Sequence, residues 1–146
     1  MDNKIRVGFF GFGKTGRLVV NEFLKDPDFE VMWVFRKTHK DEEKYASRLL
    51  GYEYDAGKIH TVQSLNGHFY QNNPVDIIVD FAHSTAVNYY KEAADYDVKI
   101  ISAISKYEDE DFNTLYALKD KTALVYSPNI TLGINFLLVA SQILQK

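Results

Sequence analysis

The sequence predicts an α/β fold, a single domain built on a doubly wound parallel sheet, and three observations lead to this prediction. Apolar runs of strand length alternate along the chain with segments of helical spacing. The first run, Ile5 to Phe10, leads directly into a glycine-rich turn and a helical pattern. The second, Phe29 to Phe35, is apolar nearly throughout, as a strand covered on both faces should be. Alternating strands and helices are typical of a parallel sheet with helices on both faces.

The remaining elements follow the same alternation. Further strands are expected at Lys58 to Val62, Val75 to Phe81, Val98 to Ala103 and Ala123 to Tyr126. Helices are expected at Asp41 to Leu50, Ser64 to Tyr70, Ala86 to Tyr96 with Ser84 as N-cap, Glu108 through Leu118, and Thr131 to Lys146. We therefore expect one domain over residues 1–130 and a closing helix over residues 131–146.

Composition limits the function classes. The 146 residues suit one domain with a substantial core, and a net charge of −3 argues against extended nucleic-acid binding. No apolar run approaches the length of a membrane span, and the N-terminus lacks the apolar core of a signal peptide. The absence of cysteine excludes disulfides and thiol catalysis. Together these features predict a cytoplasmic protein that does not bind membranes.

The turn after the first strand has the spacing G-x-G-x-x-G at Gly11, Gly13 and Gly16. Gly11 permits the sharp turn, Gly13 lets backbone N–H groups approach a pyrophosphate, and Gly16 lets the helix pack closely on the sheet. The helix N-terminus then offers unpaired N–H groups to the anion. Because the motif lies between a strand and a helix, it predicts a Rossmann-type dinucleotide site. The alternative is a glycine turn that only packs a helix onto a strand.

The end of the second strand indicates which cofactor is preferred. An NAD site usually has Asp or Glu there, to accept a hydrogen bond from the ribose 2′-OH. This chain has Arg36, about twenty residues after Gly16, followed by Lys37. Since an arginine can pair with a 2′-phosphate, we expect NADPH to be preferred and NADH to be accepted as well. The competing interpretation is a solvated basic loop.

No catalytic constellation stands out. The four histidines, His39, His60, His68 and His83, are not spaced as metal ligands, and no Ser-His-Asp arrangement or close carboxylate pair is present. His83 alone lies at an expected ligand-facing strand end, where a surface role is favoured over a catalytic one. Asp80 either orients backbone in the site or caps the turn from Ala82 to Ser84. We therefore assign no catalytic residue and no metal.

Two blocks resemble the N-terminal part of the dihydrodipicolinate reductase family. Asp80-Phe81 is similar to the family's D-F-(S/T) strand end. Ser127-Pro128-Asn129 with Leu132-Gly133-Ile134-Asn135 resembles its (A/S)-P-N-(F/M)-S-x-G-V-N block. The family reduces 4-hydroxy-tetrahydrodipicolinate with NADPH or NADH on the bacterial route to diaminopimelate and lysine. The resemblance extends from about Ile5 to Leu138 and implies an oxidoreductase.

The resemblance also implies which residues bind the cofactor. It assigns the pyrophosphate to Gly11, Phe12, Gly13, Lys14, Thr15 and Gly16. It assigns the adenosine 2′ position to Arg36, with Lys37 beside it. Phe81 and Ala82 would lie along the cofactor, and its nicotinamide end would contact Ala103, Ile104, Ser105, Ser127, Pro128, Asn129 and Ile130.

The chain departs from the family in two ways. Ala103-Ile104-Ser105-Lys106 replaces the family's G-T-T-G or A-T-T-G block, so both threonines, whose side contacts substrate in the family, and the final glycine are missing. The family's H-H…K motif and K-x-D-x-P-S-G-T-A loop, which belong to its C-terminal substrate domain, are absent from this sequence. The chain is therefore interpreted as a fragment of a longer enzyme or as a natural one-domain relative, inactive alone.

Two other interpretations stay open. One is a non-catalytic NADP-binding module, acting as a sensor or subunit. The other is a different two-domain dehydrogenase, similar to homoserine or sugar dehydrogenases. A small-molecule substrate is expected only where a second domain exists. The apolar closing helix suggests pairing with another copy of the chain.

Overall fold

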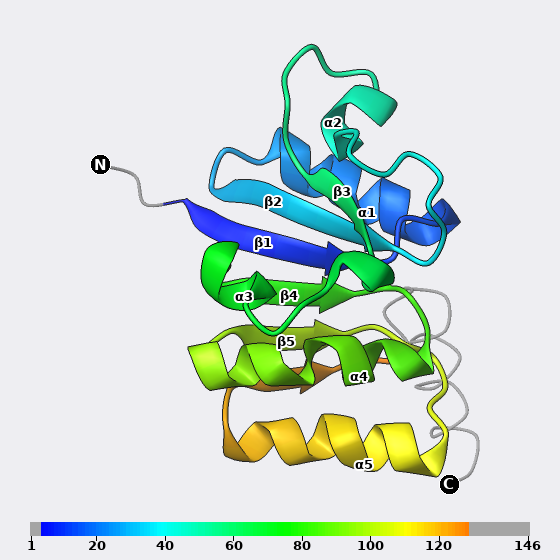
Figure 1. The fold of residues 1–146 in the computed structure, drawn as a ribbon, viewed down its shortest axis with the longest axis vertical. Helices are drawn as coiled ribbons and strands as arrows, with labels where there is room; N and C mark the ends of the chain where they lie inside the picture. Colours follow the sequence, from blue (N-terminus) through cyan, green and yellow to red (C-terminus); the bar gives the residue numbers. More distant parts are fainter. Residues whose placement is uncertain (1–3, 129–146) are drawn as a thin grey trace, which may run out of the picture.

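A six-stranded parallel sheet with strand order β3-β2-β1-β4-β5-β6 forms the centre of the computed structural model, which describes residues 4–128 (Figure 1). The strands are β1 (Ile5–Phe10), β2 (Phe29–Arg36), β3 (Lys58–Thr61), β4 (Ile77–Asp80), β5 (Lys99–Ser102) and β6 (Leu124–Tyr126). Every neighbouring pair is parallel. The predicted doubly wound parallel sheet is confirmed, and the strand order reverses between β1 and β4.

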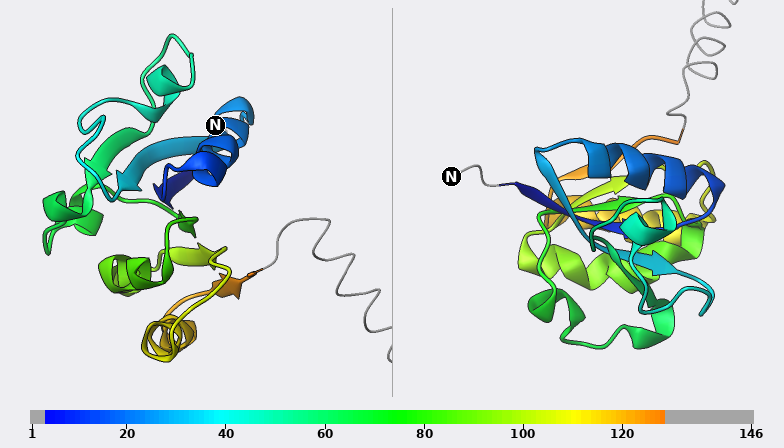
Figure 2. Two further views of the ribbon diagram at one scale, coloured as in Figure 1. Left: turned by 90° about the vertical axis from the view of Figure 1, so that its right-hand side faces the viewer. Right: turned by 90° about the horizontal axis from the view of Figure 1, so that it is seen from above.

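Helices cover both faces of this sheet (Figure 2). Helix α1 lies on one face, and α3, α4 and α5 lie on the other. The α-helices are α1 (Lys14–Lys25), α2 (Ala46–Leu49), α3 (Phe69–Asn72), α4 (Val87–Tyr90) and α5 (Asp109–Ala117). Short 3-10 helices cover Val62–Ser64, Ser84–Ala86, Lys91–Tyr96 and Leu118–Asp120. None of the helices described is both long enough and apolar enough to cross a membrane.

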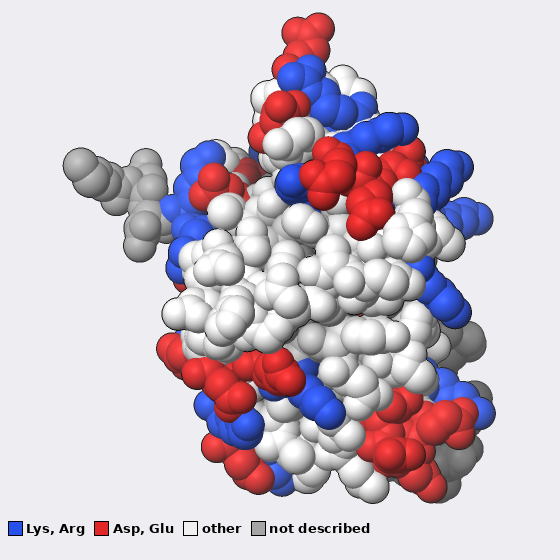
Figure 3. Space-filling model, viewed as in Figure 1, with Lys and Arg blue, Asp and Glu red and all other residues white. Residues whose placement is uncertain are grey.

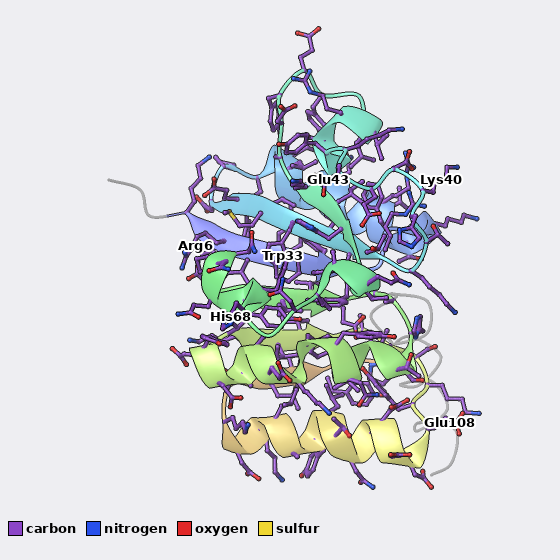
Figure 4. The ribbon with its side chains drawn as sticks, viewed as in Figure 1. Arg6, Trp33, Lys40, Glu43, His68 and Glu108 are labelled. Atoms are coloured by element: carbon purple, nitrogen blue, oxygen red, sulfur yellow. The ribbon has the colours of Figure 1, made fainter. Side chains whose placement is uncertain are left out.

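Each face of the sheet has its own apolar core. On the α1 side, Phe9 and Val20 are fully buried in one cluster. On the opposite side, Trp33 packs edge-on against Phe35 and Phe69, with ring centroids 5.3 and 5.6 Å away. Figure 4 shows Trp33 between β2 and α3. Burial on both faces explains why β1 and β2 are almost continuously apolar in sequence.

The predicted helix from Asp41 to Leu50 was largely wrong, because only Ala46–Leu49 is helical. Asp41 and Glu43 have positive φ angles of 65° and 66°, which a right-handed helix excludes. The acidic residues of this segment bind other parts of the chain instead of forming a helical turn. Glu42 accepts a hydrogen bond from Thr61, and Glu43 pairs with Lys58.

Two further helices differ from the prediction. Residues 64–70 contain a turn at Asn66, whose side-chain oxygen accepts from the His68 N–H, so α3 begins only at Phe69. Residues 84–96 are helical as expected but wound mostly as 3-10 turns. Ser84 is not the N-cap, since extended His83 occupies that position. The predicted helix over 131–146 lies outside the described residues.

Candidate functional site

The loops that follow four of the strands form a row along one edge of the sheet. Each begins with a backbone N–H that donates to the end of the neighbouring strand. These bonds join Gly11 to Phe35 (3.0 Å), Phe81 to Phe10 (2.8 Å), Ala103 to Asp80 (2.9 Å) and Ser127 to Ser102 (2.9 Å). The predicted strand-end segments therefore lie side by side, at the edge where open α/β sheets bind their ligands.

Two glycines of the turn after β1 are required by the packing of the protein itself. Gly11 has a φ of +98°, and a Cβ there would lie 2.7 Å from the carbonyl carbon of Phe81. A Cβ on Gly16 would lie 2.3 Å from the carbonyl oxygen of Gly11. The sharp turn and the close approach predicted for these two positions are both present.

Gly13 differs from its two neighbours in the motif. Its φ of −79° and ψ of −161° are open to any residue. Apart from its chain neighbours, no described atom lies within 4 Å of where a Cβ would stand. Gly13 is also the N-cap of the twelve-residue helix α1, which has no acidic residue in its first turn and no side-chain cap. The helix N-terminus therefore presents backbone N–H groups and a partial positive charge to open space.

A cavity of about 410 Å³ opens beside this turn, between the ends of β1, β2 and β4. This volume falls within the range of small-molecule sites. The predicted cofactor residues that line it are Gly11, Phe12, Gly13, Arg36, Lys37, Phe81 and Ala82. The predicted residues outside its lining are Lys14, Thr15, Gly16, Ala103, Ile104, Ser105, Ser127 and Pro128. Asn129 and Ile130 lie outside the described residues.

The cavity also has lining residues that the predicted cofactor set did not include, among them His83, for which a surface role was favoured. They are Phe10, Phe35, Thr38, Val62, His83, Thr85, Ala86 and Tyr89. Tyr89 and Ala86 come from the helical turns after β4, and Val62 directly follows β3. His83 is exposed, and its Nδ1 lies 2.7 Å from the Thr85 hydroxyl oxygen. The position of those lining residues that directly follow a strand could have been inferred from the sequence, because residues that come directly after parallel strands lie together at one edge of the sheet.

Positive charge surrounds the glycine turn. The ring of Phe12 is only 3% exposed, and the guanidinium carbons of Arg17 and Arg36 lie 5.2 and 5.8 Å from its centroid. In Figures 3 and 4, basic side chains gather near Lys40, beyond the end of β2 and beside acidic ones around Glu43, whereas acidic side chains predominate near Glu108 at the start of α5. The cavity edge near β1 and β2 is therefore the side better suited to an anion.

A buried polar chain lies beneath the row of loops. Asp80 is fully buried; its carboxylate accepts from the Ala82 N–H and the Tyr90 hydroxyl, both at 2.9 Å. Tyr107 lies near Tyr90, and its hydroxyl oxygen is 2.7 Å from that of Ser102. Burial raises the pKa of the Asp80 carboxyl to about 7, and the two hydrogen bonds oppose this change. Asp80 thus caps the turn after β4, one of its two predicted roles.

The glycine turn, the strand order and the cavity at the β1–β4 reversal together define a dinucleotide-binding domain of the Rossmann type. The particular family is given by a family model described as dihydrodipicolinate reductase, N-terminus, which matches residues 5–130. The chain belongs to this family, and the resemblance predicted from the sequence is confirmed. A comparison with curated proteins finds no match for the chain.

Solved structures share the fold at low sequence identity. A myo-inositol dehydrogenase from Corynebacterium glutamicum ATCC 13032 is 15% identical, with a TM-score of 0.60 over 84% of this chain and 36% of that one. A homoserine dehydrogenase from S. aureus is 15% identical, with a TM-score of 0.62 over 86% and 33%. RSP, a Rex-family repressor, is 14% identical, with a TM-score of 0.64 over 97% and 60%. The chain thus spans about a third of the length of the two dehydrogenases.

Proposed function

We propose that the chain is the NAD(P)H-binding domain of a dihydrodipicolinate reductase-like oxidoreductase, which reduces 4-hydroxy-tetrahydrodipicolinate in diaminopimelate and lysine biosynthesis. When bound, the cofactor supplies the hydride, and the protein supplies orientation and electrostatics. Residues 131–146 would lead into a substrate domain. On this proposal the 146-residue chain binds the cofactor and turns over little or nothing alone.

The observation that carries the proposal is the environment of Gly13. Its backbone angles and surroundings would accept a larger residue, so the described residues give no packing reason for a glycine. A pyrophosphate held by the N–H groups at the start of α1 does give one, because a Cβ would stand between the helix and the phosphate oxygens.

The cavity supports the placement of the adenosine half. Phe35 and Ala86 give it an apolar interior, and Arg36 and Lys37 place positive charge at the end of β2. Such a pocket can enclose an adenine ring and leave a ribose 2′-phosphate beside the arginine. We assign the 2′ position to Arg36 on this basis.

The row of loops supports a placement of the nicotinamide half of the cofactor. From Gly11 it continues through Phe81 and Ala103 to Ser127, along neighbouring strands. A dinucleotide with its pyrophosphate at Gly13 would extend its nicotinamide toward Ala103 and Ser127.

Binding to purified protein by calorimetry tests the cofactor assignment. We expect NADPH to bind more tightly than NADH, because Arg36 pairs with the 2′-phosphate, and Arg36→Ala to reduce this preference about three- to tenfold. Arg48→Ala, which removes an exposed arginine paired with Asp55, is the matched control and should leave the ratio unchanged. A ratio of NADPH to NADH affinity that is the same in Arg36→Ala as in the wild type would contradict the assignment of Arg36.

A non-catalytic NADP-binding module is a second candidate, favoured by residues 103–106. Ile104 is buried and Ser105 is exposed where the family has threonines, and Lys106 is exposed where the family has a glycine. The full gene product separates the two candidates in an absorbance assay. Oxidation of NADPH on addition of 4-hydroxy-tetrahydrodipicolinate supports the reductase, and a stable cofactor complex under the same conditions supports the module.

A further inference from the structure

Asp41 lies next to the residue assigned to the cofactor's 2′ position. Nη1 of Arg36 donates to Oδ2 of Asp41 at 2.7 Å, and the two side chains are only 18% and 11% exposed. From the sequence alone, Asp41 is expected in a helix and has no assigned role. The structure instead places its carboxylate directly beside the guanidinium expected to bind a phosphate.

Arg36 is held from two sides. Asp41 binds one terminal nitrogen, and the buried ring of Phe12 lies against the guanidinium, 5.8 Å from centroid to carbon. Because Phe12 belongs to the glycine turn, the ion pair and the expected pyrophosphate site share one scaffold. Arg36 is therefore already paired with Asp41 before a cofactor binds.

The loop holds Asp41 in place. Glu42 accepts from the Thr61 hydroxyl at 2.8 Å, and the N–H of Glu43 donates to the Ile59 carbonyl at 3.0 Å. Lys44 Nζ donates to the second oxygen of Asp41 at 2.9 Å. This bond and the nearby charges of Lys44 and Arg36 hold the pKa of the Asp41 carboxyl below its ordinary value. Asp41 is therefore an ionised and anchored carboxylate at neutral pH.

A fixed carboxylate affects the two cofactors differently. The dianionic 2′-phosphate of NADPH must share Arg36 with Asp41 and is repelled by its charge. The uncharged 2′-hydroxyl of NADH meets no such repulsion. We propose that Asp41 is a specificity-determining residue, an inference that rests on the proposed cofactor site. The pairing of Asp41 with Arg36 limits the preference for the 2′-phosphate, so that the chain binds both NADH and NADPH.

Calorimetric titration of Asp41→Asn with NADPH and with NADH tests this role. Asparagine has the same shape as aspartate and is tolerated at positive φ, so the loop should keep its conformation at the φ of 65°. We expect NADPH to bind about five- to tenfold more tightly than to wild type, with less than about a twofold change for NADH. Asp41→Gly, which also accepts this φ, should behave alike. Asp55→Asn, at an exposed ion pair with Arg48, is the control.

A double-mutant cycle shows whether Asp41 acts through Arg36. In an Arg36→Ala background, Asp41→Asn should raise the ratio of NADPH to NADH affinity by less than in the wild-type background, because competition for Arg36 is gone and only the direct repulsion of the phosphate remains. An unchanged or lowered ratio in the single variants would overturn the proposal, the lowered ratio indicating that Asp41 only positions Arg36 for the phosphate. If the wild type bound neither NADPH nor NADH, the proposed cofactor site itself would be overturned, and this inference with it.

Discussion

Replacing Gly13 by alanine should weaken NADPH binding roughly ten- to hundredfold while lowering the free energy of unfolding by less than about 1 kcal/mol. The added methyl group meets no described atom within 4 Å other than its chain neighbours, so the fold has little reason to respond. It would stand where phosphate oxygens approach the N-terminus of α1, and losing one charge-assisted hydrogen bond there costs about 1.5–3 kcal/mol. Calorimetry with NADPH and urea unfolding measure the two effects.

Gly11→Ala provides the matched contrast within the same motif. Here the φ of +98° and the Phe81 carbonyl carbon at 2.7 Å both oppose a side chain. We expect a loss of about 3 kcal/mol or more of unfolding free energy, whether or not a nucleotide is present. A role for Gly13 in ligand binding would be contradicted if Gly13→Ala destabilised the protein as much as Gly11→Ala, or if it bound NADPH like the wild type.

Asp80→Asn should remove a pH dependence of stability worth roughly 2–3 kcal/mol between about pH 5 and about pH 8. Burial raises the pKa of the Asp80 carboxyl from 3.8 to about 7, so the folded protein binds this proton more tightly than the unfolded chain. The stability linked to it is present in full below about pH 4 and is lost as the pH rises through about 7. Between about pH 5 and about pH 8, the free energy of unfolding of the wild type should therefore fall by roughly 2–3 kcal/mol more than that of Asp80→Asn.

Urea unfolding at the two pH values measures this difference. Asp28→Asn, at an exposed position in the turn before β2, should keep the wild-type dependence on pH. Tyr90→Phe removes a hydroxyl that donates to the carboxylate and should steepen the loss of stability at high pH. Parallel pH profiles for wild type and Asp80→Asn would contradict the account of the buried carboxyl.

The parallel sheet could be predicted because its strands are buried on both faces. Runs such as Ile5–Phe10 and Phe29–Phe35 are almost continuously apolar for this reason, and the glycine turn indicates where the first strand ends. The segment from Asp41 to Leu50 could not be predicted from helix propensity. Its conformation depends on ion pairs with Arg36 and Lys58, which are made across the fold.

Prediction of the site was limited in a similar way. Strand ends identified the glycine turn, Arg36 and Phe81, since in a parallel sheet these ends meet at one edge. Tyr89 and Val62 were missed because they reach the cavity from the next helical turn and from an outer strand. Asp41, the partner of Arg36, was missed because its backbone has a positive φ, which the surrounding sequence does not indicate.

Residue-resolved NMR titration of the protein with NADPH tests the central claim most directly, since it reports where a nucleotide binds as well as whether it does. The proposed site predicts saturable shifts, with one cofactor per chain, for the backbone amides of Gly11, Gly13, Arg36 and Ala82. Amides at the far end of the sheet, such as that of Lys99, should stay unchanged. Saturable shifts confined to other surfaces, or no shifts at millimolar NADPH, would contradict a dinucleotide site at the β1–β4 reversal.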